Sequence, residues 1–307
     1  MWANTNLVPE GVRVFTDFGN MISDPDLAAV IIDSPSPMCA KHSMAAVRHG
    51  IHVLCGTANI LDLASLEALM QAVHSDPSTA KAMVGCIRRF DSRSLTALKW
   101  IQDREIGVPT VIHSRVTEKV GITASATGGE SQANNMVLDT IVPDLDLTLS
   151  FLGEDVKPRA VWATGWAHHK LDELGYRDDM VGVVEFWDKT IVYYHHSRNM
   201  VDDFNYCMKI MGTAGEISIC LNKNEVPDSV LASLDRPSRW IDCCRGAIIA
   251  QIDQFVEAIL DDKKLPLRLE SAHVALNISL ALQQSIATGK NINFDINGRR
   301  IPLLPNS

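Results

Sequence analysis

Residues 26–56 read DLAAVIIDSPSPMCAKHSMAAVRHGIHVLCG, and this stretch decides the fold class. The continuous apolar run at residues 28–33 is typical of a buried parallel strand, and the SPSP sequence at residues 34–37 interrupts it. Residues 42–49 are expected to form a helix that ends at a glycine, and residues 51–55 form the next strand. Strand, helix and strand in this order predict a right-handed βαβ unit.

The same alternation continues on both sides of this stretch. Residues 12–15 are a short strand candidate upstream of it. Downstream, Asp62 fits the N-cap of a helix with apolar residues at helical spacing, and residues 82–86 form another strand. A helix over residues 92–104 follows. Alternating strands and helices predict a parallel sheet, so the first part of the chain is expected to be a truncated Rossmann-like domain.

After this helix the sequence predicts strands that follow one another directly. These strands are expected at residues 110–118, 160–167, 180–187, 190–197, 206–212 and 216–221. Tight turns at residues 188–189 and 212–215 join neighbouring strands, which predicts an antiparallel sheet. Two late helices, at residues 246–261 and 271–288, complete the pattern.

The predicted fold class is therefore α/β plus α+β. Residues 1–104 form a truncated Rossmann-like parallel sheet domain, and residues 105–307 form an open, mostly antiparallel sheet domain with helices. The late helices could pack back on the first domain. Because long strands without a cover commonly pack against another copy, we expect a homo-oligomer through the C-terminal sheet.

Composition excludes several classes of function. The 307 residues carry a formal net charge of -9 without a basic stripe, which argues against nucleic acid as a partner. Neither a bilayer-spanning apolar run nor a signal peptide is visible, so we expect no membrane partner and a cytoplasmic location. The seven cysteines lack CxxC spacing and are expected to be free thiols in a reducing compartment.

The order of these segments resembles the Gfo/Idh/MocA family of NAD(P)-dependent oxidoreductases. Residues 12–56 resemble the family's stretch from its third to its fifth strand, and VGCIRRFD at residues 84–91 resembles the strand and arginine pair that link its two domains. EIGVPTVIHSR at residues 105–115 resembles the entry into the second domain. DTIVPDLDLTLSFLGE at residues 139–154 resembles the helix that carries catalytic groups, and GTAGEISI at residues 212–219 resembles a late hairpin.

The chain departs from this family at the positions that handle the nucleotide. The family opens with a strand and a G-x-G-x-x-G turn that lets the backbone approach a pyrophosphate, and nothing in residues 1–10 can do this. The family's lysine, placed near the nicotinamide, is replaced within the sequence GTAN, and its Thr-Pro turn reads Ser-Pro. The vestigial cofactor positions are Ser34, Pro35, Gly56 and Thr57.

A third departure concerns acid–base chemistry. The family's catalytic histidine follows its aspartate by four residues, and here Pro143 follows Asp139 in that way. Proline cannot transfer a proton. Two interpretations remain open: a truncated gene model, or a coordinated loss of hydride chemistry.

The candidate catalytic residues are Asp139, Lys119 and His195. The resemblance places Asp139 in the substrate pocket, where a carboxylate could act as a general base, although a structural aspartate is the alternative. Lys119 could restore a cation, or simply lie on the surface. His195 and His196 are adjacent on a predicted strand, so one of them must face the inner side of the sheet.

The candidate substrate-binding residues are Asn135, His168 and Arg88. Asn135 could offer hydrogen bonds to an oxygen-rich ligand or form a turn. Arg88 belongs to the arginine pair and could bind an anion, with a structural salt bridge as the alternative. Asp144 and Asp146 are expected to be solvated or structural. No spacing of His, Asp or Glu fits a metal site, so no metal is expected.

These observations lead to three hypotheses about function. The main expectation is an oxidoreductase-like protein repurposed as a cofactor-independent lyase, isomerase or cyclase on a small organic molecule, with Asp139 as its acid or base and no cofactor. The first alternative is an NAD(P)-dependent oxidoreductase of the Gfo/Idh/MocA family in truncated or divergent form. The second is a non-catalytic small-molecule-binding or regulatory protein.

Overall fold

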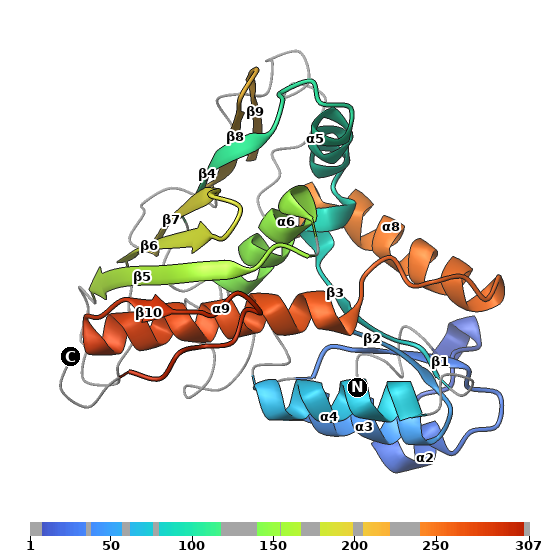
Figure 1. Ribbon diagram of the computed structural model, residues 1–307. Helices are drawn as coiled ribbons and strands as arrows, with labels where there is room; N and C mark the ends of the chain where they lie inside the picture. Colours follow the sequence, from blue (N-terminus) through green and yellow to red (C-terminus); the bar gives the residue numbers. More distant parts are fainter. Residues whose placement is uncertain are drawn as a thin grey trace.

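The chain folds into two β-sheets that long helices join (Figure 1). The computed structural model describes residues 8–34, 38–56, 62–75, 80–117, 140–153, 155–166, 179–198, 205–221 and 240–303. A three-stranded parallel sheet comes first, and a seven-stranded, mostly antiparallel sheet follows it. The predicted fold class, α/β plus α+β, is confirmed.

The first sheet has the strand order β1-β2-β3, with all neighbours parallel. Its strands are β1 (Ala29–Ile32), β2 (His52–Gly56) and β3 (Ala82–Gly85), and the crossover helices are α3 (Met38–Arg48) and α4 (Leu63–Ser75). Asp62 caps α4 as predicted, because its Oδ1 accepts the Ser65 N–H at 2.7 Å. The strands and helices predicted around residues 28–86 are therefore present.

The strand predicted at residues 12–15 is wrong. This segment is irregular and lies between the short helices η1 (Val8–Glu10) and α2 (Phe18–Ile22), and β1 pairs with β2 alone among the described strands. An extended segment gains its backbone hydrogen bonds only by pairing with a neighbour. Here the local contacts are polar instead: Arg13 Nη1 lies 2.5 Å from Asp24 Oδ2, and Asp17 caps α2.

The second sheet has the order β10-β5-β6-β7-β4-β8-β9. Its strands are β4 (Pro109–Thr117), β5 (Pro158–Trp166), β6 (Asp179–Phe186), β7 (Ile191–Ser197), β8 (Asn205–Gly212), β9 (Glu216–Leu221) and β10 (Ile292–Asn293). β4 and β7 are parallel, and the other neighbours are antiparallel. The six predicted strands are present, and β10 is an additional one.

Helices connect the two sheets. They are η3 (Ile87–Phe90), α5 (Ser92–Gln102), α6 (Val142–Leu152), α8 (Trp240–Leu260) and α9 (Leu269–Thr288). α9 packs against β5 and α6 and also contacts α4 and β3 (Figure 1). Phe255 of α8 packs in a core cluster with Leu54 of β2 and Met83 of β3. Both late helices thus contact the first sheet.

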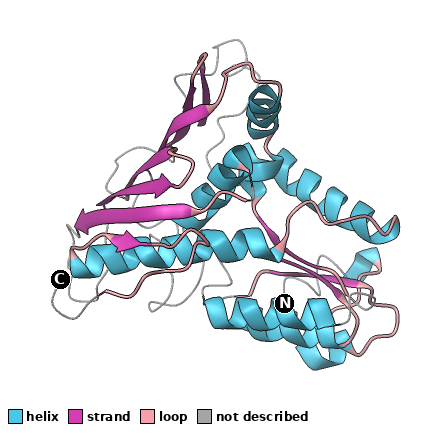
Figure 2. Ribbon diagram, viewed as in Figure 1, coloured by secondary structure: helices cyan, strands magenta, loops and turns pink. Residues whose placement is uncertain are grey.

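The second sheet carries its helices on one face (Figure 2). Along β6, Met180 and Val184 are fully buried on the face that α9 covers, whereas Val181 and Val183 alternate with them and are half-buried. The outward face is therefore open among the described residues.

One expectation about the cysteines is wrong. Cys207 of β8 and Cys220 of β9 lie opposite each other in the strand register and form a disulfide. Cys207 and Cys220 are 13 positions apart, and this separation by itself does not indicate a disulfide. The pairing follows from the register of the two strands. Among the described cysteines, Cys39, Cys55 and Cys86 are buried free thiols, and Cys244 is buried as well.

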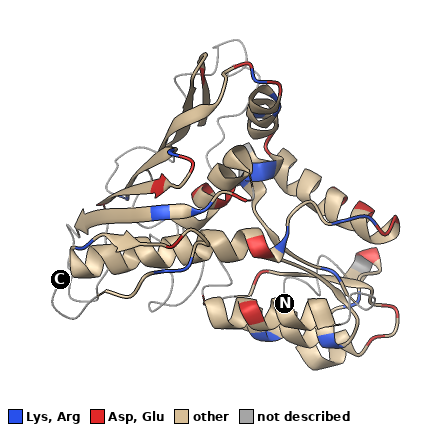
Figure 3. Cartoon of the chain, viewed as in Figure 1, with Lys and Arg blue, Asp and Glu red and all other residues tan. Residues whose placement is uncertain are grey.

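The expected absence of a membrane or nucleic-acid partner stays a prediction. Charged residues of both signs are scattered along the ribbon (Figure 3). No described helix has the length and apolarity needed to cross a membrane. The cytoplasmic location stays a prediction.

Candidate functional site

The carboxyl edge of the parallel sheet is the first part of the candidate site. Gly56 and Gly85 are paired at the ends of β2 and β3. Gln251 of α8 rests on Gly85 so closely that a Cβ there would lie 2.6 Å from Gln251 Oε1. This oxygen is buried and has no hydrogen-bond partner among the described residues. Ligands of open parallel sheets bind at such carboxyl edges.

The start of α6 lies beside this edge. Cys86 follows β3 directly, and its Sγ lies 3.6 Å from the backbone oxygen of Pro143 in the first turn of α6. Burial raises the pKa of the Cys86 thiol, so this contact involves a neutral thiol. The first turn of α6 is thereby held where the parallel strands end.

Two buried ion pairs attach α6 to η3. Arg88 contacts Asp144, and the Arg89 guanidinium binds Asp146 through two hydrogen bonds of 2.6 and 2.8 Å. All four side chains are largely or completely buried. The Arg88 guanidinium also lies 4.6 Å from the centre of the Tyr206 ring, in cation–π contact. The arginine pair therefore forms the salt bridges that the sequence left as an alternative role.

Asp144 is the centre of a larger buried cluster, which we call the Asp144 cluster: Ser114, Thr140, Asp144 and His196. Ser114 Oγ of β4 donates to Asp144 Oδ2 at 2.5 Å, and His196 Nε2 of β7 lies 3.0 Å from the same oxygen. On the other side of the ring, His196 Nδ1 lies 2.8 Å from Thr140 Oγ1. A chain of polar contacts thus runs from Arg88 through Asp144 and His196 to Thr140.

The structure places only some of the predicted site residues. Arg88 is buried against Asp144, and Ser34 and Gly56 lie at the carboxyl edge of the parallel sheet, where Ser34 Oγ is 3.1 Å from His42 Nδ1. His195 lies on the outward face of the second sheet, beside Arg115 in the register. Six predicted site residues lie outside the described residues: Asp139, Lys119, Asn135, His168, Pro35 and Thr57. The roles predicted for all these residues stay predictions.

None of the four members of the Asp144 cluster was among the predicted site residues: Ser114, Thr140, Asp144 and His196. The alternation of residues along β7 could have identified His196. Val192 and Tyr194 lie on the same face of the strand as His196, and both are fully buried. The phase of these apolar residues points His196, rather than His195, toward α6. Asp144 is buried and paired rather than solvated.

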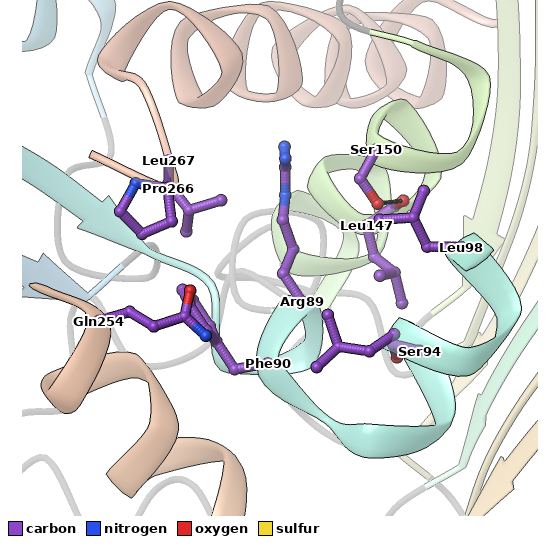
Figure 4. Close-up of a pocket in the computed structure, with 10 residues that line it drawn as sticks. Arg89, Phe90, Ser94, Leu98, Leu147, Ser150, Gln254, Pro266 and Leu267 are labelled. Carbon is purple, nitrogen blue, oxygen red and sulfur yellow. Dashed lines mark hydrogen bonds between the residues drawn. The ribbon is translucent and has the colours of Figure 1, made fainter. Parts of the chain in front are cut away.

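A small hollow of about 140 Å³ lies beside the Arg89–Asp146 ion pair (Figure 4). Leucine, phenylalanine and proline side chains form most of its wall, and Arg89 extends into it from η3. Since Arg89 is already bound to Asp146, this hollow offers little for acid–base chemistry. In the described residues, no group of three His, Cys, Asp or Glu side chains is arranged to hold a metal ion.

A parallel sheet followed by an open, mostly antiparallel sheet is also the fold of a scyllo-inositol dehydrogenase from Lactobacillus casei, with a TM-score of 0.81. Residues 94–218 match the family model described as the GFO/IDH/MocA C-terminal domain. Residues 94–218 are thus similar to the C-terminal domain of the Gfo/Idh/MocA family, and the chain as a whole has the fold of that family's dehydrogenases.

Similar proteins extend this resemblance over most of the chain. The uncharacterized oxidoreductase YrbE of Bacillus subtilis is 24% identical over 96% of this chain and 85% of its own length. The myo-inositol 2-dehydrogenase of Thermotoga maritima is 20% identical over 92% of this chain and 84% of its own. The structure of scyllo-inositol dehydrogenase from Lactobacillus casei with bound NAD(H) and scyllo-inositol has a TM-score of 0.82 and 25% identity, over 95% of this chain and 87% of its own.

These relatives correct two expectations. The expected cofactor-independent lyase, isomerase or cyclase is contradicted, because the similar proteins are dehydrogenases. The expected absence of a cofactor is contradicted as well, because one similar structure contains NAD(H). The expectation that no cofactor binds relied on sequence changes at a few local positions. The carboxyl edge of the parallel sheet and the start of α6 beside it are nevertheless both present.

Proposed function

We propose that the protein is an NAD(P)-dependent oxidoreductase that interconverts a secondary alcohol and a ketone on a cyclic polyol of the inositol type. The observation that carries this proposal is the likeness, over 95% of the chain, to a dehydrogenase that holds NAD(H) and scyllo-inositol. The family match of residues 94–218 and the inositol dehydrogenase of Thermotoga maritima support the same class.

The described residues fit the nicotinamide end of such a cofactor. The buried Gln251 Oε1, without a hydrogen-bond partner, is an acceptor suited to the N–H groups of a carboxamide, and it lies at the carboxyl end of β3. Gly56 and Gly85 present no side chains at this edge. No described residue is assigned to the phosphates, because the sequence has no G-x-G-x-x-G motif. When bound, the cofactor would accept the hydride of the carbinol carbon.

The chain's own residues would bind and orient the polyol and receive its proton. The start of α6 lies beside the sheet edge, since the backbone oxygen of Pro143 contacts Cys86. Two buried ion pairs fix its position, so groups at this helix end are held in place before substrate arrives. Such positioning favours a reaction in which a hydroxyl group must be aligned with a hydride acceptor.

Titration with NADH and NADPH, followed by fluorescence, tests the cofactor. We expect micromolar affinity for at least one of the two nucleotides. Incubation with NAD⁺ or NADP⁺ and myo-inositol or scyllo-inositol should then produce the absorbance of the reduced nucleotide, with glycerol as the acyclic control. Failure to bind either nucleotide would refute the proposal. Reduction of the nucleotide by glycerol, but by neither inositol, would refute the proposed substrate class.

A further inference from the structure

We propose that Thr140 and His196 form a proton relay for the alcohol group of the substrate, with Asp144 and Ser114 as positioning residues. This inference rests on the oxidoreductase activity proposed above. It concerns a step that neither the fold nor the family match assigns: where the hydroxyl proton goes. The position expected for an acid–base histidine carries Pro143, which has no group to accept it.

The geometry orders the relay from inside to outside. Asp144 is completely buried, His196 is 1% exposed and Thr140 is 7% exposed, so Thr140 is the end nearest to solvent. Thr140 also immediately precedes Ile141, the N-cap of α6, and the first turn of this helix touches Cys86 at the end of β3. The outer end of the chain of contacts therefore lies at the edge where the parallel strands end.

The relay requires one particular tautomer of His196, with the proton on Nε2. Nε2 lies 3.0 Å from Asp144 Oδ2, within ion-pair distance but outside hydrogen-bond geometry, and the charge of the carboxylate favours a proton on this nitrogen. Nδ1 is then the acceptor, and Thr140 Oγ1 donates its proton to it across 2.8 Å. Arg88 and Ser114 hold the Asp144 carboxylate in place, which keeps the ring oriented.

The step balances in atoms and electrons. As the carbinol C–H bond breaks, the hydride with its two electrons leaves for the nicotinamide of the proposed activity. The substrate O–H proton passes to Thr140 Oγ1 while the proton of Thr140 passes to His196 Nδ1. The substrate becomes a ketone, and His196 becomes an imidazolium that the Asp144 carboxylate stabilises. Ketone reduction runs the same transfers in reverse.

Thr140→Val tests the relay, because it keeps the shape and removes the hydroxyl group. We expect kcat to fall by about 100-fold, in the range of general acid–base catalysis. Because His196 must be neutral to accept the proton, the relay predicts that kcat of the unaltered protein rises with pH, and this rise should be lost in Thr140→Val. Thr140→Ser keeps a hydroxyl group and should restore both kcat and the pH profile.

Thr148→Val is the matched control. Thr148 is also a buried threonine at α6, and its Oγ1 donates to the Asp144 backbone oxygen at 2.7 Å and accepts from Tyr194 OH at 3.1 Å. This variant should lower the melting temperature but leave the pH profile of kcat unchanged. Equal losses in both variants, with the same pH profile, would show a structural role and overturn the relay.

Nitrogen NMR of the histidine rings gives a readout that needs neither cofactor nor turnover. We expect His196 to be neutral with its proton on Nε2, and its Nδ1 signal to shift in Thr140→Val but not in Thr148→Val. A ring protonated on Nδ1 overturns the relay. If the unaltered protein shows no turnover, the proposed oxidoreductase activity is overturned. If the unaltered protein turns over and Thr140→Val is equally active, only the relay is overturned.

Discussion

At the scale of single residues, the buried charges between η3 and α6 are the most informative feature. Arg89 and Asp146 are 11% and 4% exposed and form a two-bonded pair, whereas Arg159 and Glu185 form a contact of 3.4 Å on the surface. Breaking a buried pair leaves the remaining charge without compensation, and breaking an exposed pair does not.

Asp146→Asn should therefore lower the free energy of unfolding by about 3 kcal/mol, because it removes the carboxylate that pairs with the buried Arg89 cation. Glu185→Gln is the matched control and should change it by less than about 0.5 kcal/mol. Urea denaturation followed by circular dichroism measures both. If both variants change the free energy of unfolding by similarly small amounts, the buried pair does not stabilise the fold as predicted.

A second residue prediction concerns pH. Burial, with a smaller contribution from Lys81, lowers the pKa of His52 below its ordinary 6.5, and His52 Nδ1 accepts the Lys81 N–H at 2.9 Å. The folded protein keeps this ring neutral while the unfolded chain takes up a proton, so stability is lost as pH falls below about 6.5. His52→Asn keeps an acceptor but does not titrate.

Unfolding measured from pH 7 to pH 5 should show a smaller loss of stability in His52→Asn than in the unaltered protein. A residual slope is expected, because burial also lowers the pKa of His113. Identical slopes in the two proteins would show that His52 does not contribute.

At the scale of elements, close packing at the β8–β9 hairpin requires glycine at one position and not at another. A Cβ at Gly212 would lie 2.1 Å from the backbone oxygen of Ile106, whereas the nearest atom to a Cβ at Gly215 is 3.8 Å away. The entry into β4 thus passes directly against the end of β8.

Gly212→Ala should lower the free energy of unfolding by about 2 kcal/mol, because the backbone of Ile106 must move. Gly215→Ala, in the same hairpin, should change it by less than about 0.5 kcal/mol. Thermal unfolding of the two variants side by side distinguishes them. A more damaging Gly215→Ala would contradict this packing.

At the scale of the whole molecule, the outward face of the second sheet has no cover among the described residues. Trp162, Val183 and Tyr193 are neighbours across β5, β6 and β7 on this face, and Trp162 is 40% exposed. Aromatic and aliphatic side chains gathered on an open sheet favour association with a second copy. Self-association through this face stays a prediction.

Sedimentation velocity should show a homo-oligomer, and Val183→Lys should shift it to the monomer by placing a charge in the centre of the face. Leu260→Lys, at the 79% exposed end of α8, is the matched control and should leave the oligomer intact. A monomer at all concentrations, or an oligomer that resists Val183→Lys, would contradict the prediction.

Much of the fold was predictable because its signals are local. The apolar run at β1, the helical spacing after Asp62 and the alternation in β6 each reflect a few neighbouring residues, and all three elements are present. The segment at residues 12–15 failed because a strand also needs a partner, and β1 offers it no pairing. The Asp144 cluster was predicted least, since its members come from β4, β7 and the start of α6.

The sequence by itself determined the order of elements and the two kinds of sheet, since the periods of strands and helices are properties of adjacent residues. The sequence also drew attention to the arginine pair and to Asp144 and Asp146, but it did not show that they form ion pairs with each other. Only the tertiary structure decided that Arg89 binds Asp146 across 57 positions of sequence, and that His196 rather than His195 meets Thr140 across 56. Contacts between residues so far apart depend on how the elements pack, because no local pattern encodes them.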